Sequence, residues 1–73
     1  MHVRFHCYAR AHGKEWAMGA IDSRAVPMAA RLFFSRVMCP RGELERLLEN
    51  AIRTPLVKHR IGDTTVWAVP TVG

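Results

Sequence analysis

Acidic residues are scarce in this sequence: six Asp and Glu stand against eleven Lys and Arg in 73 residues, giving a formal net charge of +5 at pH 7. Nine of the eleven cations are Arg, whose planar guanidinium pairs with carboxylate or phosphate and stacks on aromatic rings. A positive field of this strength attracts acidic surfaces. We therefore expect the partner to be a nucleic acid or an acidic patch on a larger protein.

Cysteines and long apolar runs are also few. Two cysteines, Cys7 and Cys39, cannot form a disulfide scaffold, and their apolar surroundings predict reduced, buried thiols in a cytosolic protein. No stretch approaches the ~18 consecutive apolar residues of a membrane span, and the alternating residues 2–10 do not resemble a secretory signal. We expect a single domain, residues 1–73, that buries only about 60% of its unfolded surface.

Catalytic and metal-binding motifs are missing as well. His2 and His6 would lie about 13 Å apart on a strand, too far for one metal ion, and no Cys-x-x-Cys pair occurs. The glycines are scattered and form no phosphate-binding loop. Neither Cys7 nor Cys39 has neighbours that would activate it as a nucleophile beside His59. The sequence therefore predicts a protein that is not an enzyme and holds no metal or cofactor.

Residues 2–10 alternate in polarity, which predicts a half-buried strand. Its apolar face would carry Val3, Phe5, Cys7 and Ala9, and its outer face would carry His2, Arg4, His6, Tyr8 and Arg10. A turn at 11–14 and a second alternating stretch at Glu15–Ile21 predict a first hairpin. Residues 22–27 are expected to form a loop, because Pro27 disfavours a helical conformation of Val26.

Residues 28–38 fit two structures. Four apolar residues would share one face of a helix at 26–37, whereas residues 32–38 alternate as in a strand at 31–38. The aromatic pair and a valine favour the strand slightly, while the alanines and Pro27 near a first turn favour the helix. The strand is therefore a possible addition to the sheet.

An amphipathic helix over 42–53 is the clearest pattern in the chain. Five apolar side chains follow the i, i+3, i+4 spacing of one helix face. They are Leu44, Leu47, Leu48, Ala51 and Ile52. Its three glutamates neutralise Arg46 and Arg53, so this helix is not expected to form the basic surface.

A second hairpin is predicted at Leu56–Ile61 and Thr64–Val69. Gly62-Asp63 would join the strands in a type II′ turn, or in a type I′ turn if Asp63 also has positive φ. This register places Lys58 and Arg60 on the same ribbon face as Trp67, while the opposite face is apolar apart from His59 and Thr64.

Together these elements predict an α+β fold: a small antiparallel sheet of two hairpins, possibly with a further strand at 31–38, packed against one amphipathic helix at 42–53. The candidate partner-binding residues lie on the outer faces of the hairpins. They are His2, Arg4, His6, Tyr8, Arg10, Lys58, Arg60 and Trp67. Burial of Trp16 and Trp67 stays open; the core is the default for each, and Trp67 is the better interface candidate.

A protein partner is favoured over a nucleic acid. The Glu-rich helix is unsuited to a DNA groove, and Tyr8 alone on the first strand is a weak signature of base stacking. The strand at 2–10 is instead expected to be a sheet edge that can accept a partner strand. Pairing of that edge with itself in a dimer stays open, and a monomer is favoured.

Three stretches, MHVRFHCYAR at 1–10, PRGELERLLEN at 40–50 and TTVWAVP at 64–70, resemble the small transcription regulators of Xanthomonas bacteriophages that bind RNA polymerase. The resemblance covers the full length and transfers no individual site residue. It implies binding to the N-terminal part of the β′ subunit of bacterial RNA polymerase in the host cytoplasm, inhibition of sigma-dependent initiation, and antitermination. The alternative is a small basic nucleic-acid-binding regulator held by phosphate contacts.

Overall fold

Four strands form one antiparallel sheet in the order β2-β1-β4-β3. They are β1 (Phe5–Ala11), β2 (Lys14–Ile21), β3 (His59–Ile61) and β4 (Thr64–Pro70). The structure is a computed structural model and describes residues 4–34 and 40–71. Both predicted hairpins and the α+β class are confirmed.

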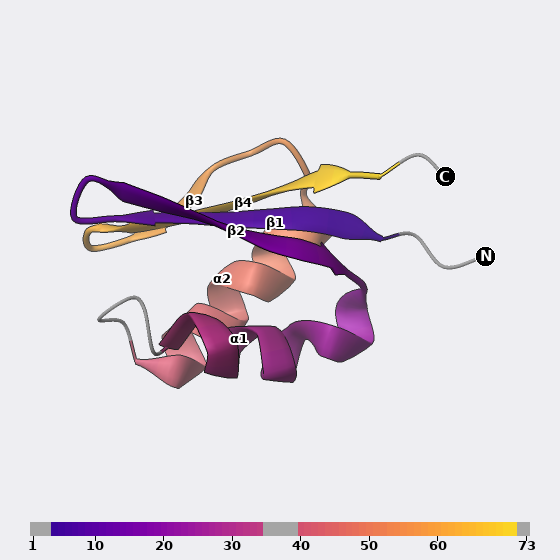
Figure 1. Ribbon diagram of the computed structural model, residues 1–73, viewed down its shortest axis with the longest axis horizontal. Helices are drawn as coiled ribbons and strands as arrows, with labels where there is room; N and C mark the ends of the chain where they lie inside the picture. The colour runs from indigo at the N-terminus through magenta and orange to yellow at the C-terminus, as the bar shows by residue number, and fades with distance from the viewer. Residues whose placement is uncertain (1–3, 35–39, 72–73) are drawn as a thin grey trace.

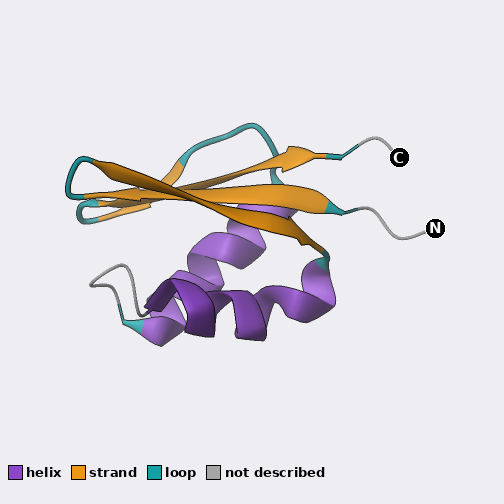
Figure 2. Cartoon of the chain, viewed as in Figure 1, coloured by secondary structure: helices purple, strands orange, loops and turns teal. Residues whose placement is uncertain are grey.

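Two helices, α1 (Val26–Phe34) and α2 (Arg41–Arg53), cover one face of the sheet and leave the other face uncovered (Figure 1). The helices pack against each other, while α2 also contacts β4, β3 and β1, and α1 contacts β2. The molecule therefore has two layers, helices below and strands above (Figure 2). Within the described residues, no helix is long and apolar enough to cross a membrane.

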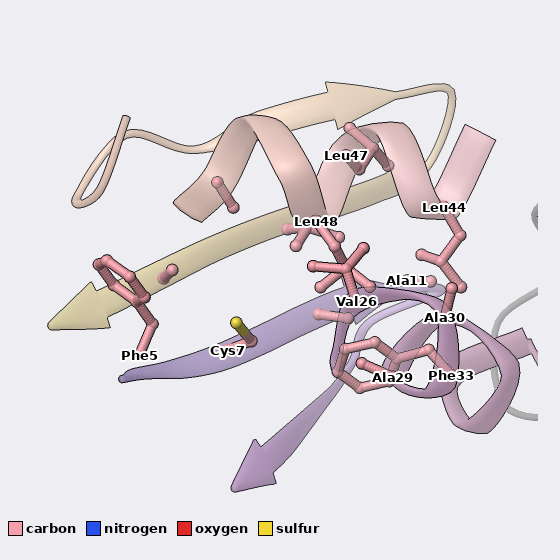
Figure 3. Close-up of a cluster of buried hydrophobic side chains, with 14 residues drawn as sticks. Phe5, Cys7, Ala11, Val26, Ala29, Ala30, Phe33, Leu44, Leu47 and Leu48 are labelled. Atoms are coloured by element: carbon pink, nitrogen blue, oxygen red, sulfur yellow. The ribbon is translucent and has the colours of Figure 1, made fainter. Parts of the chain in front are cut away.

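The core lies between the sheet and the helices. Phe5, Cys7 and Ala9 of β1 point into it, as their alternation predicts, and the residues between them face outward. From α2, Leu44, Leu47 and Leu48 enter the same layer (Figure 3). Six of the buried residues are alanine. They are Ala9, Ala11, Ala29, Ala30, Ala51 and Ala68. Such small side chains allow the helices to approach the sheet closely.

The chain over residues 26–34 is helical, so the strand expected at 31–38 is wrong for residues 31–34; residues 35–38 lie outside the described part. The side chain of Asp22 accepts hydrogen bonds from the backbone N–H groups of Arg24 and Ala25 at 2.9 and 3.2 Å. This cap starts a short 3-10 turn, η1 (Ser23–Ala25), that continues into α1.

Pro27 lies in the first turn of α1, where its missing N–H costs nothing. The loop expected at 22–27 is therefore wrong: Val26 is helical, with φ −55° and ψ −46°. The buried residues of α1 explain this outcome, because they follow the helical spacing i, i+3, i+4, i+7. They are Val26, Ala29, Ala30 and Phe33.

The N-terminal strand is not a sheet edge. β1 lies between β2 and β4, so its backbone groups are paired on both sides, and the expected acceptance of a partner strand by β1 is wrong. The edges of the sheet are β2 and β3. The second hairpin has the predicted register, with Arg60 opposite Thr65, but β3 begins at His59 rather than at Leu56.

The two hairpin turns use positive φ angles. His12 and Gly13 have φ of 53° and 74°, the combination of a type I′ turn. Gly62 has φ 59° and Asp63 is not left-handed, which fits the type II′ alternative. The turns lie close together, because Nδ1 of His12 is 3.8 Å from Oδ2 of Asp63.

We predict that Leu48→Ala lowers the free energy of unfolding by ~2 to 5 kcal/mol, because Leu48 is fully buried between α2 and the sheet. Chemical denaturation followed by circular dichroism measures this change. Arg46→Ala on the same helix is the matched control, since Arg46 is exposed. Equal stability of the two variants would contradict the core described here.

Candidate partner-binding face

The outer face of the sheet is the one that the helices leave uncovered (Figure 1). The strand pairings set its rows. One row runs Ala17, Tyr8, Trp67, and the next runs Glu15, Arg10, Thr65, Arg60. On β2 this face carries Ala17 opposite Tyr8, Ala20 opposite His6 and Glu15 opposite Arg10.

Tyr8 and Trp67 stack on each other at the centre of this face. Their ring centroids are 5.6 Å apart, and the ring planes differ by 17°. The two residues face each other because β1 pairs with β4 in the register that places Tyr8 opposite Trp67. Both side chains are half-buried, so the pair is fixed yet accessible.

Two cations contact the indole ring. Nζ of Lys58 lies 5.2 Å, and the guanidinium carbon of Arg10 5.9 Å, from the ring centroid of Trp67. These are cation–π distances, and the contact between Lys58 and Trp67 predicted from the hairpin register is confirmed. We call Tyr8, Arg10, Lys58 and Trp67 the aromatic-basic cluster. It joins four of the eight predicted site residues.

Three of the remaining predicted residues lie outside this cluster. Arg60 is exposed on the outer row, and its Nε donates a 2.7 Å hydrogen bond to the carbonyl of Gly62. His6 is exposed on the outer face, opposite Val69. Arg4 is exposed just before β1, and its carbonyl accepts hydrogen bonds from Thr71. His2 lies outside the described residues.

Glu15 is an acidic residue on this face that the sequence reasoning did not connect with the site. Its Oε2 lies 3.3 Å from Nη2 of Arg10, and both side chains are about half exposed. An ion pair this exposed contributes little to stability. It does orient the Arg10 guanidinium beside Trp67 and reduces the net charge at that end of the face.

Exposed aliphatic residues adjoin the cluster. Leu56, Val57 and Val69 are 71, 46 and 36% exposed. The sequence reasoning missed them because it placed Leu56 and Val57 inside a strand. The Thr54-Pro55 pair indicates where the helix ends, but it does not indicate which of the following side chains leave the core.

The two tryptophans differ in position. Trp16 pairs with Ala9 on the inner side of the sheet and packs against the core, as the default predicts. Trp67 lies on the outer face. His59, expected on the apolar ribbon face, is half-buried, and its Nε2 is 3.2 Å from the carbonyl oxygen of Thr54.

The cysteine of β1 lies on the inner side of the sheet. Cys7 is fully buried, and burial raises the pKa of its thiol to about 11, which disfavours the thiolate that a nucleophile requires. Cys39 lies outside the described residues. Within the described part of the chain, no three His, Cys, Asp or Glu side chains gather as they would around a metal ion.

No family model matches the chain, and neither a curated protein nor a solved structure matches it.

We predict that Cys7 resists thiol reagents at pH 8 while the protein is folded. In a Cys39→Ser variant, the labelling rate should be roughly 100-fold lower in the native protein than in denaturant, because raising the pKa from 9.0 to about 11 leaves about a hundredth of the thiolate. Colorimetric thiol titration measures both rates. Rapid labelling of the native protein would mean that Cys7 is accessible and reactive.

Proposed function

We propose that this protein is a bacteriophage regulator that binds the RNA polymerase of its bacterial host and inhibits sigma-dependent initiation. The aromatic-basic cluster carries the proposal. Trp, Tyr and Arg are the residues that most often dominate protein interfaces, and here they meet on the one sheet face without helices. The sequence resemblance supplies the partner, the N-terminal part of the β′ subunit in the host cytoplasm, and adds antitermination.

The proposed activity needs binding and no reaction. Promoter recognition requires part of the polymerase surface. A small domain bound to that part lowers initiation because it occupies the surface. Electrostatic attraction would speed the encounter, because the cations at Lys58, Arg60 and Arg10 face outward and only Arg10 has an acidic neighbour among the contacts described on this face.

The state of the Trp67 ring favours a protein over a nucleic acid. Tyr8, Lys58 and Arg10 already contact the ring, so a base would have to displace one of them before it could stack. A protein surface needs no open ring face, since it can pack against the exposed edges of the aromatic pair and pair its carboxylates with the cations.

We predict that the purified protein binds both core RNA polymerase and an isolated N-terminal β′ fragment, and that the double charge reversal Lys58→Glu/Arg60→Glu weakens this binding about tenfold or more. Titration calorimetry measures the affinity, and transcription from a sigma-dependent promoter and through a terminator measures the activity. The affinity should also fall as salt rises, because the attraction is screened.

The matched control is Arg46→Glu/Arg53→Glu, which changes the net charge equally on the exposed side of α2. This variant should bind as the wild type does. If both double variants bound polymerase equally weakly, the loss of affinity would follow from net charge alone and not from the positions of Lys58 and Arg60. Absence of polymerase binding by the wild-type protein would remove the proposal.

A nucleic-acid-binding regulator is the second candidate, favoured by one observation: an aromatic pair flanked by cations on an open sheet face. It predicts quenching of Trp67 fluorescence by a single-stranded oligonucleotide in a Trp16→Phe variant. The logarithm of the affinity should then fall against log salt with a slope of about 0.7 per phosphate neutralised. No quenching at low salt would dismiss this candidate.

A further inference from the structure

Leu56 combines two unfavourable features. It is the most exposed of the large hydrophobic residues in the described part of the chain, at 71%. Its φ is 69°, in the left-handed region, where the Cβ of a leucine crowds its own backbone. Apart from glycines, the only other described residue with positive φ is His12, whose hairpin turn requires it. Leu56 also lies in a turn, but leucine is a residue type that this conformation disfavours.

The backbone around Leu56 is held firmly. Pro55 and Leu56 are the two central residues of a turn, in which a positive φ at the second position normally selects Gly or Asn. The N–H of Leu56 donates a 2.9 Å hydrogen bond to the carbonyl of Ala68 in β4. Strain that is fixed in this way, at a side chain with no role in the core, is typical of functional positions.

The position of the turn connects Leu56 with the outer face. The chain over 54–58 arches on the side of the sheet away from the helices (Figure 1, orange). Exposed Val57 follows Leu56, and Val69 follows the hydrogen-bonding partner Ala68. Lys58, two residues after Leu56, contacts Trp67. We call Leu56, Val57 and Val69 the apolar corner; it borders the aromatic-basic cluster.

We propose that Leu56 is the anchor of the interface, inserting into an apolar pocket on a protein partner whose surrounding surface is acidic. The inference rests on the proposed function, in which the outer face binds a protein. The charges define the partner: Lys58 and Arg60 beside the corner require carboxylates opposite them. A second copy of this chain would bring like charges together, and an aliphatic anchor offers a nucleic acid neither stacking nor a phosphate contact.

Affinity and stability together test the anchor. Leucine at position 56 strengthens binding to the partner, but its positive φ strains the backbone of the folded protein. Removing it should relieve the backbone while it weakens the complex. Glycine and asparagine both accept positive φ, so they test the anchor without introducing strain. An exposed leucine on the helical side, Leu32 of α1 at 57% exposure, provides the comparison.

Leu56→Gly and Leu56→Asn are expected to bind the β′ N-terminal fragment about tenfold or more weakly than the wild type, with a melting temperature that is unchanged or higher. Leu32→Ala should leave the affinity unchanged. Titration calorimetry and thermal unfolding followed by circular dichroism give the two quantities independently.

The outcomes separate the anchor from the proposed function. Wild-type binding with unaltered affinity of both Leu56 variants would overturn the anchor alone. A lower melting temperature of both variants would assign Leu56 to the fold and also overturn it, whatever the partner. Failure of the wild type to bind polymerase would overturn the proposed function and, with it, this inference.

Discussion

The whole structure depends on a single apolar layer between the sheet and the two helices. A chain this short can bury only part of its surface, and its two helices cover one side of the sheet. Phe33, Leu44 and Leu48 are the largest fully buried side chains of that layer, while the buried alanines let the backbones approach. One consequence is stability that rests on few side chains. The other is an outer face that neither helix covers.

Strand register, rather than any local motif, builds the candidate site. Tyr8 and Trp67 meet because β1 and β4 pair with these two residues opposite each other, and Lys58 joins them through the second hairpin. Each of these residues would be unremarkable alone. Together they form a surface with an aromatic pair at its centre and cations beside it, bordered by the apolar corner. Such a mixed surface suits a partner that is itself mixed, with acidic and apolar regions side by side.

The sequence predicted the elements whose periodicity has one interpretation. Strict alternation identified β1, the leucine spacing identified α2, and Gly62-Asp63 fixed the second hairpin register. Residues 26–34 were predictable only in part, since Phe34 fits both periods. The cap from Asp22 and the helical spacing of the buried residues favour the helix. The central position of β1 is a long-range property, set by pairing with a strand at the other end of the chain. The positive φ of Leu56 has no signature in the residue type, because leucine rarely adopts it.

The pairing of β1 with β4 also affects how the protein folds. Thr71 donates two hydrogen bonds to the carbonyl of Arg4, and the two residues are 67 positions apart in the sequence. Contacts of such high sequence separation form late and slow folding, because a long loop must close first. A nascent chain on the ribosome therefore presents Tyr8 without Trp67 until β4 has emerged. The aromatic-basic cluster therefore forms only when β4 pairs with β1, and neither hairpin alone assembles it.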